Sequence, residues 1–150
     1  MTSSPFPILE ASKTASTLVP ALTWPKVKVL ELNIESRDYD FLGMGAEIMQ
    51  YCIKSQITPR LANRIQLVFE ELSQQLVKAL DRPHIQAVIE YSESDEKATI
   101  AFRYNGKPFD VMEEGDELSL GVVKGMATDI RYCKPDSGEY ANQVEIELSM

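Results

Sequence analysis

Two polar residues on one amphipathic stretch are the first candidates for chemistry. Glu71 and Gln75 lie four residues apart within residues 57–80, which read ITPRLANRIQLVFEELSQQLVKAL. On a helix this spacing stacks the carboxylate and the carboxamide on one face, close to the edge of the core. Such a pair is either the floor of a binding site or a solvated flank of the helix, and the stretch alone leaves both interpretations open.

The sequence excludes several common chemistries. His84 is the only histidine, and Cys52 and Cys133 are the only cysteines. They provide no ligand set for zinc, and no elbow motif places His84 beside a nucleophilic serine. Cys52 falls in a helical pattern and Cys133 in a strand pattern. Both are therefore expected to be buried small hydrophobes in a reducing cytoplasm rather than a disulfide.

The stretch that carries Glu71 and Gln75 is typical of a helix that packs on a sheet. Thr58 can serve as its N-cap, and Pro59 fits the first helical position, where its missing N–H costs nothing. Asp81 and Pro83 end the helix. Apolar residues recur between them at steps of three and four; they are Leu61, Ile65, Val68, Leu72, Leu76 and Ala79.

The remaining elements predict the fold class. Helical patterns also occupy residues 38–56 and 120–129, and strand patterns occupy residues 27–34, 85–92, 97–104, 130–133 and 143–148. The first helix is expected to face inward with Phe41, Leu42, Ile48, Met49, Cys52 and Ile53. Strand pairs joined by hairpins, with helices grouped between them, predict an α+β fold. We expect a two-layer α/β sandwich with a mostly antiparallel sheet of about five strands and three helices on one face.

Length and charge favour one domain without a nucleic-acid or membrane partner. The chain has 150 residues, and its net charge of −8 opposes binding to a nucleic-acid backbone or an anionic membrane. No apolar run reaches membrane-spanning length, and no signal peptide is visible at the start. These features predict a cytoplasmic protein.

Residues 1–26 are expected to form an N-terminal arm or interdomain linker ahead of a domain at residues 27–150. The arm is rich in proline, serine and threonine, as linkers are. It also contains large apolar residues, namely Phe6, Ile8, Leu9, Leu18, Val19, Leu22 and Trp24. We therefore expect at least part of the arm to pack on the domain, on a partner subunit in a homodimer, or on an upstream domain.

Four segments carry a resemblance to a known family. They are LANRIQLVFEELSQQLVKA, TIAFRYNGKPFD, LSLGVVKGMATDIRY and NQVEIEL. In this order they resemble the GHKL (Bergerat-fold) ATPase domain, and within it the anti-sigma-factor serine-kinase branch. The resemblance covers about residues 27–150 and implies the GHKL type of sandwich, with ATP and Mg²⁺ as the family's ligands.

The resemblance assigns roles to three central positions. Glu71 stands where the family has a glutamate that acts as a general base or orients water. Gln75 replaces an asparagine that helps to hold Mg²⁺, and its amide lies one methylene further out, although Mg²⁺ demands near-ideal octahedral geometry. Tyr104 replaces the aspartate that binds the adenine amino group. Its ring could fill the adenine slot or simply cap the core at the strand end.

The resemblance also covers the family's glycines and its lid. Gly106 is kept, Ser119 replaces the first glycine of a later pair, and Gly121 is the second. In the family these glycines let the backbone and a helix N-terminus approach phosphate. Gly121 and Gly125 could instead be close-packing positions under the sheet. Residues 109–118 form a short acidic lid that would repel a triphosphate, or a solvated loop, or an element that binds a partner.

The departures at Gln75, Tyr104 and Ser119 favour a binding protein over an enzyme. We expect a regulatory, signalling-type module of bacterial kind with weak or lost ATP binding. Its partner would be a sigma-like factor, an antagonist protein or an upstream domain, and a homodimer is possible. The alternative is a functional ATP-binding anti-sigma factor or serine/threonine-protein kinase that tolerates these departures. A sensory or dimerisation domain of a larger protein is a further alternative, compatible with the first.

Overall fold

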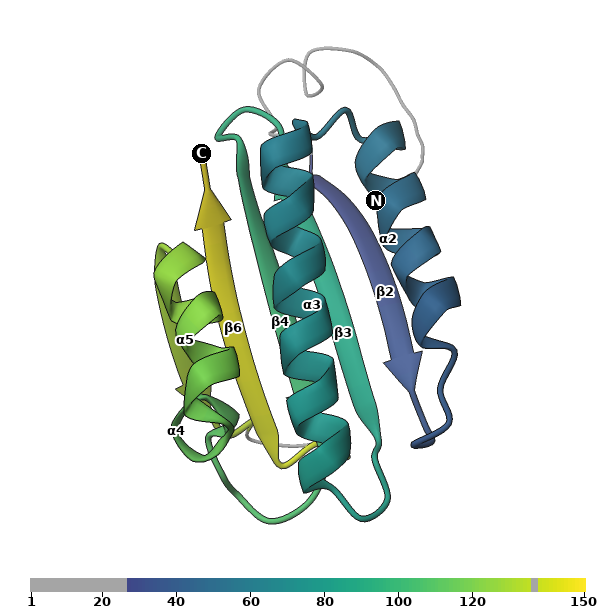
Figure 1. Cartoon of the computed structure of the whole chain (residues 1–150), viewed down its shortest axis with the longest axis vertical. Helices are drawn as coiled ribbons and strands as arrows, with labels where there is room; N and C mark the ends of the chain where they lie inside the picture. The colour runs from purple at the N-terminus through teal and green to yellow at the C-terminus, as the bar shows by residue number, and fades with distance from the viewer. Residues whose placement is uncertain (1–26, 136–137) are drawn as a thin grey trace.

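The computed structural model describes residues 27–135 and 138–150, and it has two layers (Figure 1). One layer is a five-stranded sheet in the order β2-β3-β4-β6-β5, and every neighbouring pair is antiparallel. The strands are β2 (Val27–Ile34), β3 (Ile85–Ser92), β4 (Lys97–Tyr104), β5 (Asp129–Cys133) and β6 (Asn142–Ser149). The expected α+β sandwich is confirmed. The expectation for the arm falls on residues 1–26, outside the described residues.

The second layer consists of helices on one face of the sheet (Figure 1). They are α2 (Phe41–Lys54), α3 (Pro59–Ala79), α4 (Val111–Glu114) and α5 (Glu117–Met126). The short α4 and the first two residues of α5, Glu117 and Leu118, lie within residues 109–118, which were expected to form an acidic lid or loop. Among the described residues, no helix combines the length and apolar character needed to cross a membrane.

Helix α3 packs over the centre of the sheet, as its apolar stripe predicts (Figure 1). Ile65, Leu72 and Leu76 are fully buried, and the ring of Phe69 stacks on Phe102 of β4 at a centroid distance of 6.1 Å. Thr58 occupies the N-cap position without a side-chain capping bond. The last residue of the expected stripe, Ala79, is exposed because it borders an open cavity at the end of the helix.

Helix α2 corrects the expected inward face. Ile48 and Cys52 are buried, but Leu42, Met49 and Ile53 are exposed. The helix lies over the outer part of the sheet beside β2, so only a narrow stripe can reach the core (Figure 1). Apolar residues occur around most of this helix, and the pattern therefore could not select the buried side.

The expected burial of Cys133 and the expected close packing at Gly121 and Gly125 are both wrong. Cys133 is exposed, because it lies on the open face of the edge strand β5, whereas Ile130 and Tyr132 point towards the helices. Gly121 and Gly125 are also exposed, and a Cβ added at either would meet nothing within 4 Å. Neither is a close-packing position under the sheet.

Candidate functional site

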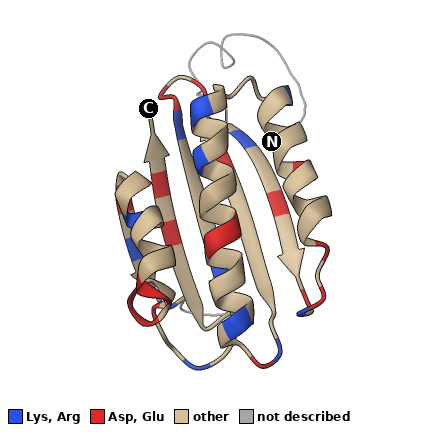
Figure 2. Ribbon diagram, in the orientation of Figure 1, with Lys and Arg blue, Asp and Glu red and all other residues tan. Residues whose placement is uncertain are grey.

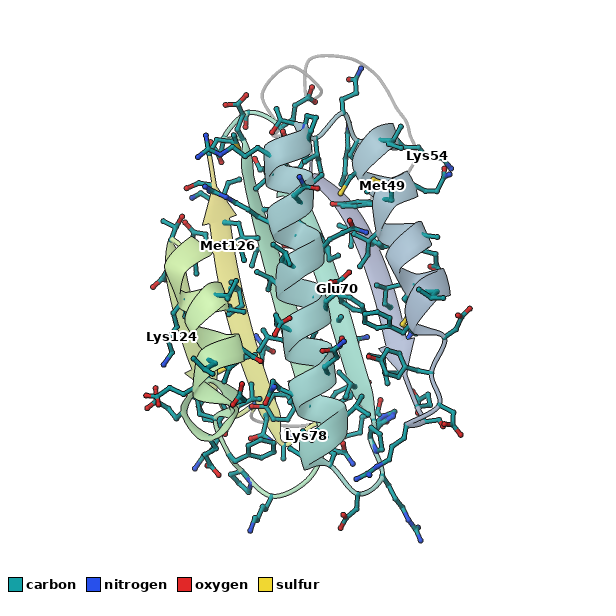
Figure 3. All side chains as sticks on the ribbon, viewed as in Figure 1. Met49, Lys54, Glu70, Lys78, Lys124 and Met126 are labelled. Carbon is teal, nitrogen blue, oxygen red and sulfur yellow. The ribbon has the colours of Figure 1, made fainter. Side chains whose placement is uncertain are left out.

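A cleft of about 1020 Å³ lies beyond the C-terminal end of α3, and we call it the α3 cleft. One wall comes from α3 and the turn after it, and the other from residues 105–116, which we call the cleft loop. Lys78 marks its position in Figure 3. The lining residues are Gln75, Lys78, Ala79, Leu80, Asp81, Arg82, Asn105, Gly106, Lys107, Phe109, Val111, Glu114, Gly115 and Asp116.

Gln75 is a half-buried residue of the cleft wall, and its side chain is bonded to the cleft loop. Its Oε1 accepts a hydrogen bond from the backbone N–H of Asp116 at 2.9 Å. Gly115 leaves little room beside it, since a Cβ there would lie 3.1 Å from the same Oε1 and 2.9 Å from the Val111 carbonyl oxygen. The oxygen that the resemblance would direct at Mg²⁺ is therefore already paired with the backbone.

Tyr104 is fully buried at the end of β4, and its hydroxyl is bonded to the backbone of the cleft loop. Its hydroxyl donates to the carbonyl of Phe109 at 2.7 Å and accepts from the N–H of Val111 at 3.2 Å. The ring of Phe109 packs edge-on against it at 5.1 Å. Burial raises the pKa of the Tyr104 hydroxyl above its ordinary value, so the hydroxyl stays neutral and can donate.

Asn142 also holds the cleft loop, and the sequence did not single it out as a candidate site residue. It is fully buried, and its Oδ1 accepts from the N–H of Phe109 at 2.8 Å and from the hydroxyl of Tyr132 at 2.6 Å. Its Nδ2 lies within 3.4 Å of three carbonyl oxygens, those of Tyr104, Asn105 and Lys107. One signal was available, because Asn142 begins the alternation that buries Val144, Ile146 and Leu148. A polar residue in a buried register must be hydrogen-bonded.

The N-terminus of α5 is capped by a side chain of the same chain segment. Asp116 is the N-cap, and its Oδ2 accepts from the backbone N–H of Ser119 at 3.0 Å. That bond lowers the pKa of the Asp116 carboxyl, which is thus anionic at neutral pH. A second anion is disfavoured at this helix end because the cap is negative. Ser119 and Gly121 do not line the cleft, among the described residues.

Gly106 and Glu71 have different positions relative to the cleft. Gly106 lines it with φ +93°, a left-handed conformation that glycine adopts without strain. Glu71 is half-buried on α3, one turn before Gln75, and lies outside the residues found to line the cleft. Thus only Gln75 and Gly106 of the candidate site residues line the cleft, and Tyr104 lies beneath its loop.

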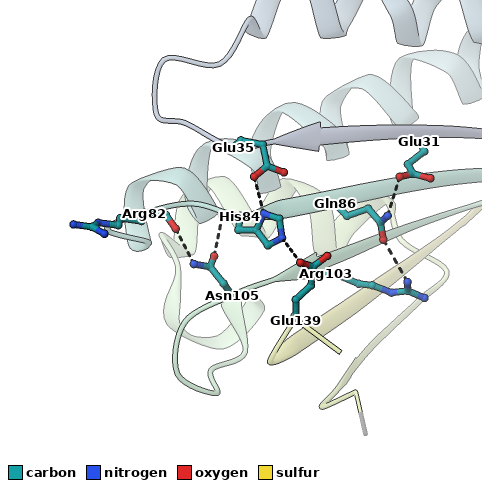
Figure 4. A network of polar contacts seen from close by, with 8 residues as sticks. All are labelled: Glu31, Glu35, Arg82, His84, Gln86, Arg103, Asn105 and Glu139. Carbon is teal, nitrogen blue, oxygen red and sulfur yellow. Dashed lines mark hydrogen bonds and ion pairs between the residues drawn. The ribbon is translucent and has the colours of Figure 1, made fainter. Parts of the chain in front are cut away.

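The base of the cleft loop is tied to the turn before β3 (Figure 4). Asn105 donates through Nδ2 to the carbonyl of Arg82 at 2.7 Å and accepts from the N–H of His84 at 2.9 Å. The His84 ring lies between the carboxylates of Glu35 at 2.7 Å and Glu139 at 3.1 Å. The hydrogen bond with Glu35 is the main cause that raises the pKa of His84.

The side chains that line the α3 cleft carry equal numbers of positive and negative charges. Lys78, Arg82 and Lys107 line it together with Asp81, Glu114 and Asp116. Figure 2 shows that side chains of both charges lie at this end of the molecule. Positive charge is what focuses a polyanion into a pocket, and here it is matched by carboxylates. In the part of the chain that the structure describes, no group of three or more His, Cys, Asp or Glu side chains could hold a metal ion.

Comparison with models of known protein families gives no match, and comparison with curated proteins gives none either. The family resemblance therefore remains a prediction from the four segments that carry it, and the candidate site has to be argued from its own geometry.

Proposed function

We propose that this protein is a non-catalytic regulatory module that binds another protein. On this view it resembles the anti-sigma-factor serine-kinase type of ATPase domain but binds ATP weakly or not at all. One observation carries the proposal: Gln75 and Tyr104, the positions that would contact Mg²⁺ and adenine, both bond the cleft loop instead.

The hydrogen bonds of these two residues oppose nucleotide binding. A ligand that turned Gln75 towards a metal would leave the N–H of Asp116 without its partner. One that displaced Tyr104 would break the bonds to Phe109 and Val111 inside the protein. A buried polar group without a partner costs about 1–3 kcal/mol, and each 1.4 kcal/mol weakens binding about tenfold. Together these costs are large enough to turn micromolar affinity into millimolar affinity.

The fixed conformation of residues 110–117 also supports the proposal of a protein partner. Residues 110–117 are held by Gln75, Tyr104 and two side-chain caps, those of Asp110 and Asp116. They present the exposed carboxylates of Glu113, Glu114 and Glu117 in a defined arrangement. A preorganised acidic surface suits a partner with a basic surface, because little ordering entropy is lost on binding. A sigma-like factor, an antagonist protein or an upstream domain in the cytoplasm would fill this role.

Restoring the family's residues tests the proposal. The double variant Gln75→Asn and Tyr104→Asp should gain measurable affinity for Mg-ATP in a calorimetric titration, while the unmodified protein should show none at micromolar concentration. Gln74→Asn is the matched control, because Gln74 is exposed on the same helix next to Gln75. Circular dichroism checks that the double variant is folded. Low-micromolar binding by the unmodified protein would favour the ATP-dependent anti-sigma factor or serine/threonine-protein kinase instead.

A further inference from the structure

Three segments that are distant in the sequence meet at the side chain of His84 (Figure 4). Glu35 follows β2, His84 precedes β3, and Glu139 lies between β5 and β6. Nδ1 of the ring lies 2.7 Å from Glu35 Oε1, and Nε2 lies 3.1 Å from Glu139 Oε2. Because β4 separates β3 from β6 in the sheet, the second contact joins segments whose strands are not neighbours.

The number of hydrogen bonds at this ring depends on its protonation. An ionised carboxylate only accepts hydrogen bonds, so a ring nitrogen must carry a hydrogen to bond its glutamate. The imidazolium ring can donate to both Glu35 and Glu139, whereas the neutral ring can donate to only one of them. The shorter contact, which is to Glu35, is expected to keep its hydrogen. The proton that passes to solvent is then the one on Nε2, which faces Glu139.

The other groups around His84 do not replace this bond. The ring of Tyr140 stacks on the imidazole at a centroid distance of 4.9 Å, and burial raises the pKa of its hydroxyl, which stays neutral. The Arg82 side chain points away from the ring (Figure 4). Glu31 and Arg103, the next charged side chains in this network, are bonded to glutamine side chains. Among the described residues, neither Glu35 nor Glu139 has an ion-pair partner besides His84.

Both sides of the His84 contact lead to the cleft loop. On one side, the His84 N–H donates to Asn105 Oδ1 at 2.9 Å, at the start of that loop. On the other side, Glu139 lies shortly before Asn142, whose Oδ1 accepts from the N–H of Phe109 at 2.8 Å. A change at Glu139 can therefore reach the cleft loop through the first residue of β6.

We propose that His84 is a proton-dependent latch between the turn before β3 and residues 138–141. The protonated ring binds Glu139 and keeps these residues fixed. Loss of the Nε2 proton releases Glu139, so that residues 138–141 become more mobile and Asn142 binds the Phe109 N–H less firmly. The latch thus makes the order of the cleft loop depend on pH, whether or not a nucleotide binds beside it.

His84 makes the latch directly measurable, because it is the only histidine in the chain. In a proton NMR titration its pKa should lie above the ordinary 6.5, chiefly because of the hydrogen bond with Glu35. From about pH 5.5 to about pH 8.5, backbone order parameters of residues 138–141 should fall from about 0.85 towards about 0.6, with the same midpoint as the ring. Exchange of the Phe109 amide, corrected for its intrinsic pH dependence, should become severalfold faster over this range.

Glu139→Gln separates the latch from a general effect of pH. A carboxamide can accept from the charged ring and donate to the neutral ring, so the order parameters should no longer depend on pH. The pKa of His84 should fall in this variant, because one negative charge is removed. Glu93→Gln is the matched control, since Glu93 is exposed in the turn at the other end of β3. It should change neither the His84 pKa nor the order parameters.

Three results would overturn this proposal. The first is a set of order parameters for residues 138–141 that stays constant while His84 titrates. The second is the same pH dependence in Glu139→Gln as in the unmodified protein. The third is a corrected Phe109 exchange rate that does not change across the His84 titration, because the latch would then not reach the cleft loop. None of these measurements involves a nucleotide or a protein partner, so their failure is distinct from a failure of the proposed function.

Discussion

The Oε1 atom of Gln75 on α3 accepts a hydrogen bond from the backbone N–H of Asp116, the residue that caps α5. The two residues are 41 positions apart in the sequence. The bond joins the central helix to the cleft loop, which forms the other wall of the α3 cleft. Because that N–H belongs to the backbone, the bond depends on Gln75 alone and can be removed by one substitution.

We expect Gln75→Ala to loosen the cleft loop without unfolding the protein. The loss of one hydrogen bond should lower the free energy of unfolding by about 1 kcal/mol. Hydrogen exchange at the Asp116 amide should become severalfold faster, because its acceptor is gone. Gln74→Ala, on the exposed side of α3, should leave that exchange rate unchanged. Equal rates in the two variants would show that Gln75 does not hold the loop.

Tyr104→Phe should also loosen the cleft loop, by removing its bonds to Phe109 and Val111. The substitution keeps the buried ring but leaves the Phe109 carbonyl and the Val111 N–H without the hydroxyl, which should cost about 1–3 kcal/mol. Tyr51→Phe is a matched control, since its hydroxyl bonds the Lys28 carbonyl at the start of β2, away from the cleft loop. Both variants should melt at lower temperature, but only Tyr104→Phe should speed hydrogen exchange in residues 109–113. Faster exchange there in both would contradict a local role for Tyr104.

Asn142→Ala should be more damaging than either change. Asn142 is fully buried and its Oδ1 serves two donors, the Phe109 N–H and the Tyr132 hydroxyl. Leaving both unpaired should cost about 2–4 kcal/mol, visible as a lower urea midpoint at unchanged slope. Asn33→Ala, which removes an exposed asparagine from β2, should shift the midpoint little. A small effect at both sites would mean that water replaces the Asn142 side chain.

The pH dependence of stability should report on His84. The carboxylates of Glu35 and Glu139 favour its protonated form, and its pKa is raised above the ordinary value of 6.5. A raised histidine pKa stabilises the folded state fully below the unfolded pKa, and this stabilisation is lost as pH rises through the folded pKa. The melting temperature should therefore fall as pH increases above 6.5. His84→Gln should make the melting temperature less dependent on pH above 6.5. An unchanged pH dependence in this variant would show that other groups cause the fall.

The sequence predicts some parts of this structure well, and for a physical reason. The stripe of α3 is narrow and flanked by polar residues, so only one face could be buried. On α2 the apolar residues surround most of the helix, and only the packed structure distinguishes Ile48 from Met49. The prediction that Cys133 is buried is wrong because strand alternation does not say which face of an edge strand is open.

The candidate site was harder to predict because its partners are backbone groups. Gln75 and Tyr104 stand out in the sequence as departures from a family pattern. Their partners are the N–H groups of Asp116 and Val111 and the carbonyl of Phe109, and these do not depend on residue type. The sequence therefore predicts that the two residues depart from the pattern of the family it resembles, but it does not predict that they hold the cleft loop.

Calorimetric titration of the unmodified protein with Mg-ATP, and separately with Mg-ADP, tests the central claim most directly. Because Gln75 and Tyr104 are bonded to the cleft loop and the cleft has matched charges, we expect no heat of binding at micromolar concentrations and at most millimolar affinity. A saturable heat with a low-micromolar dissociation constant would contradict this account and would favour a nucleotide-dependent switch.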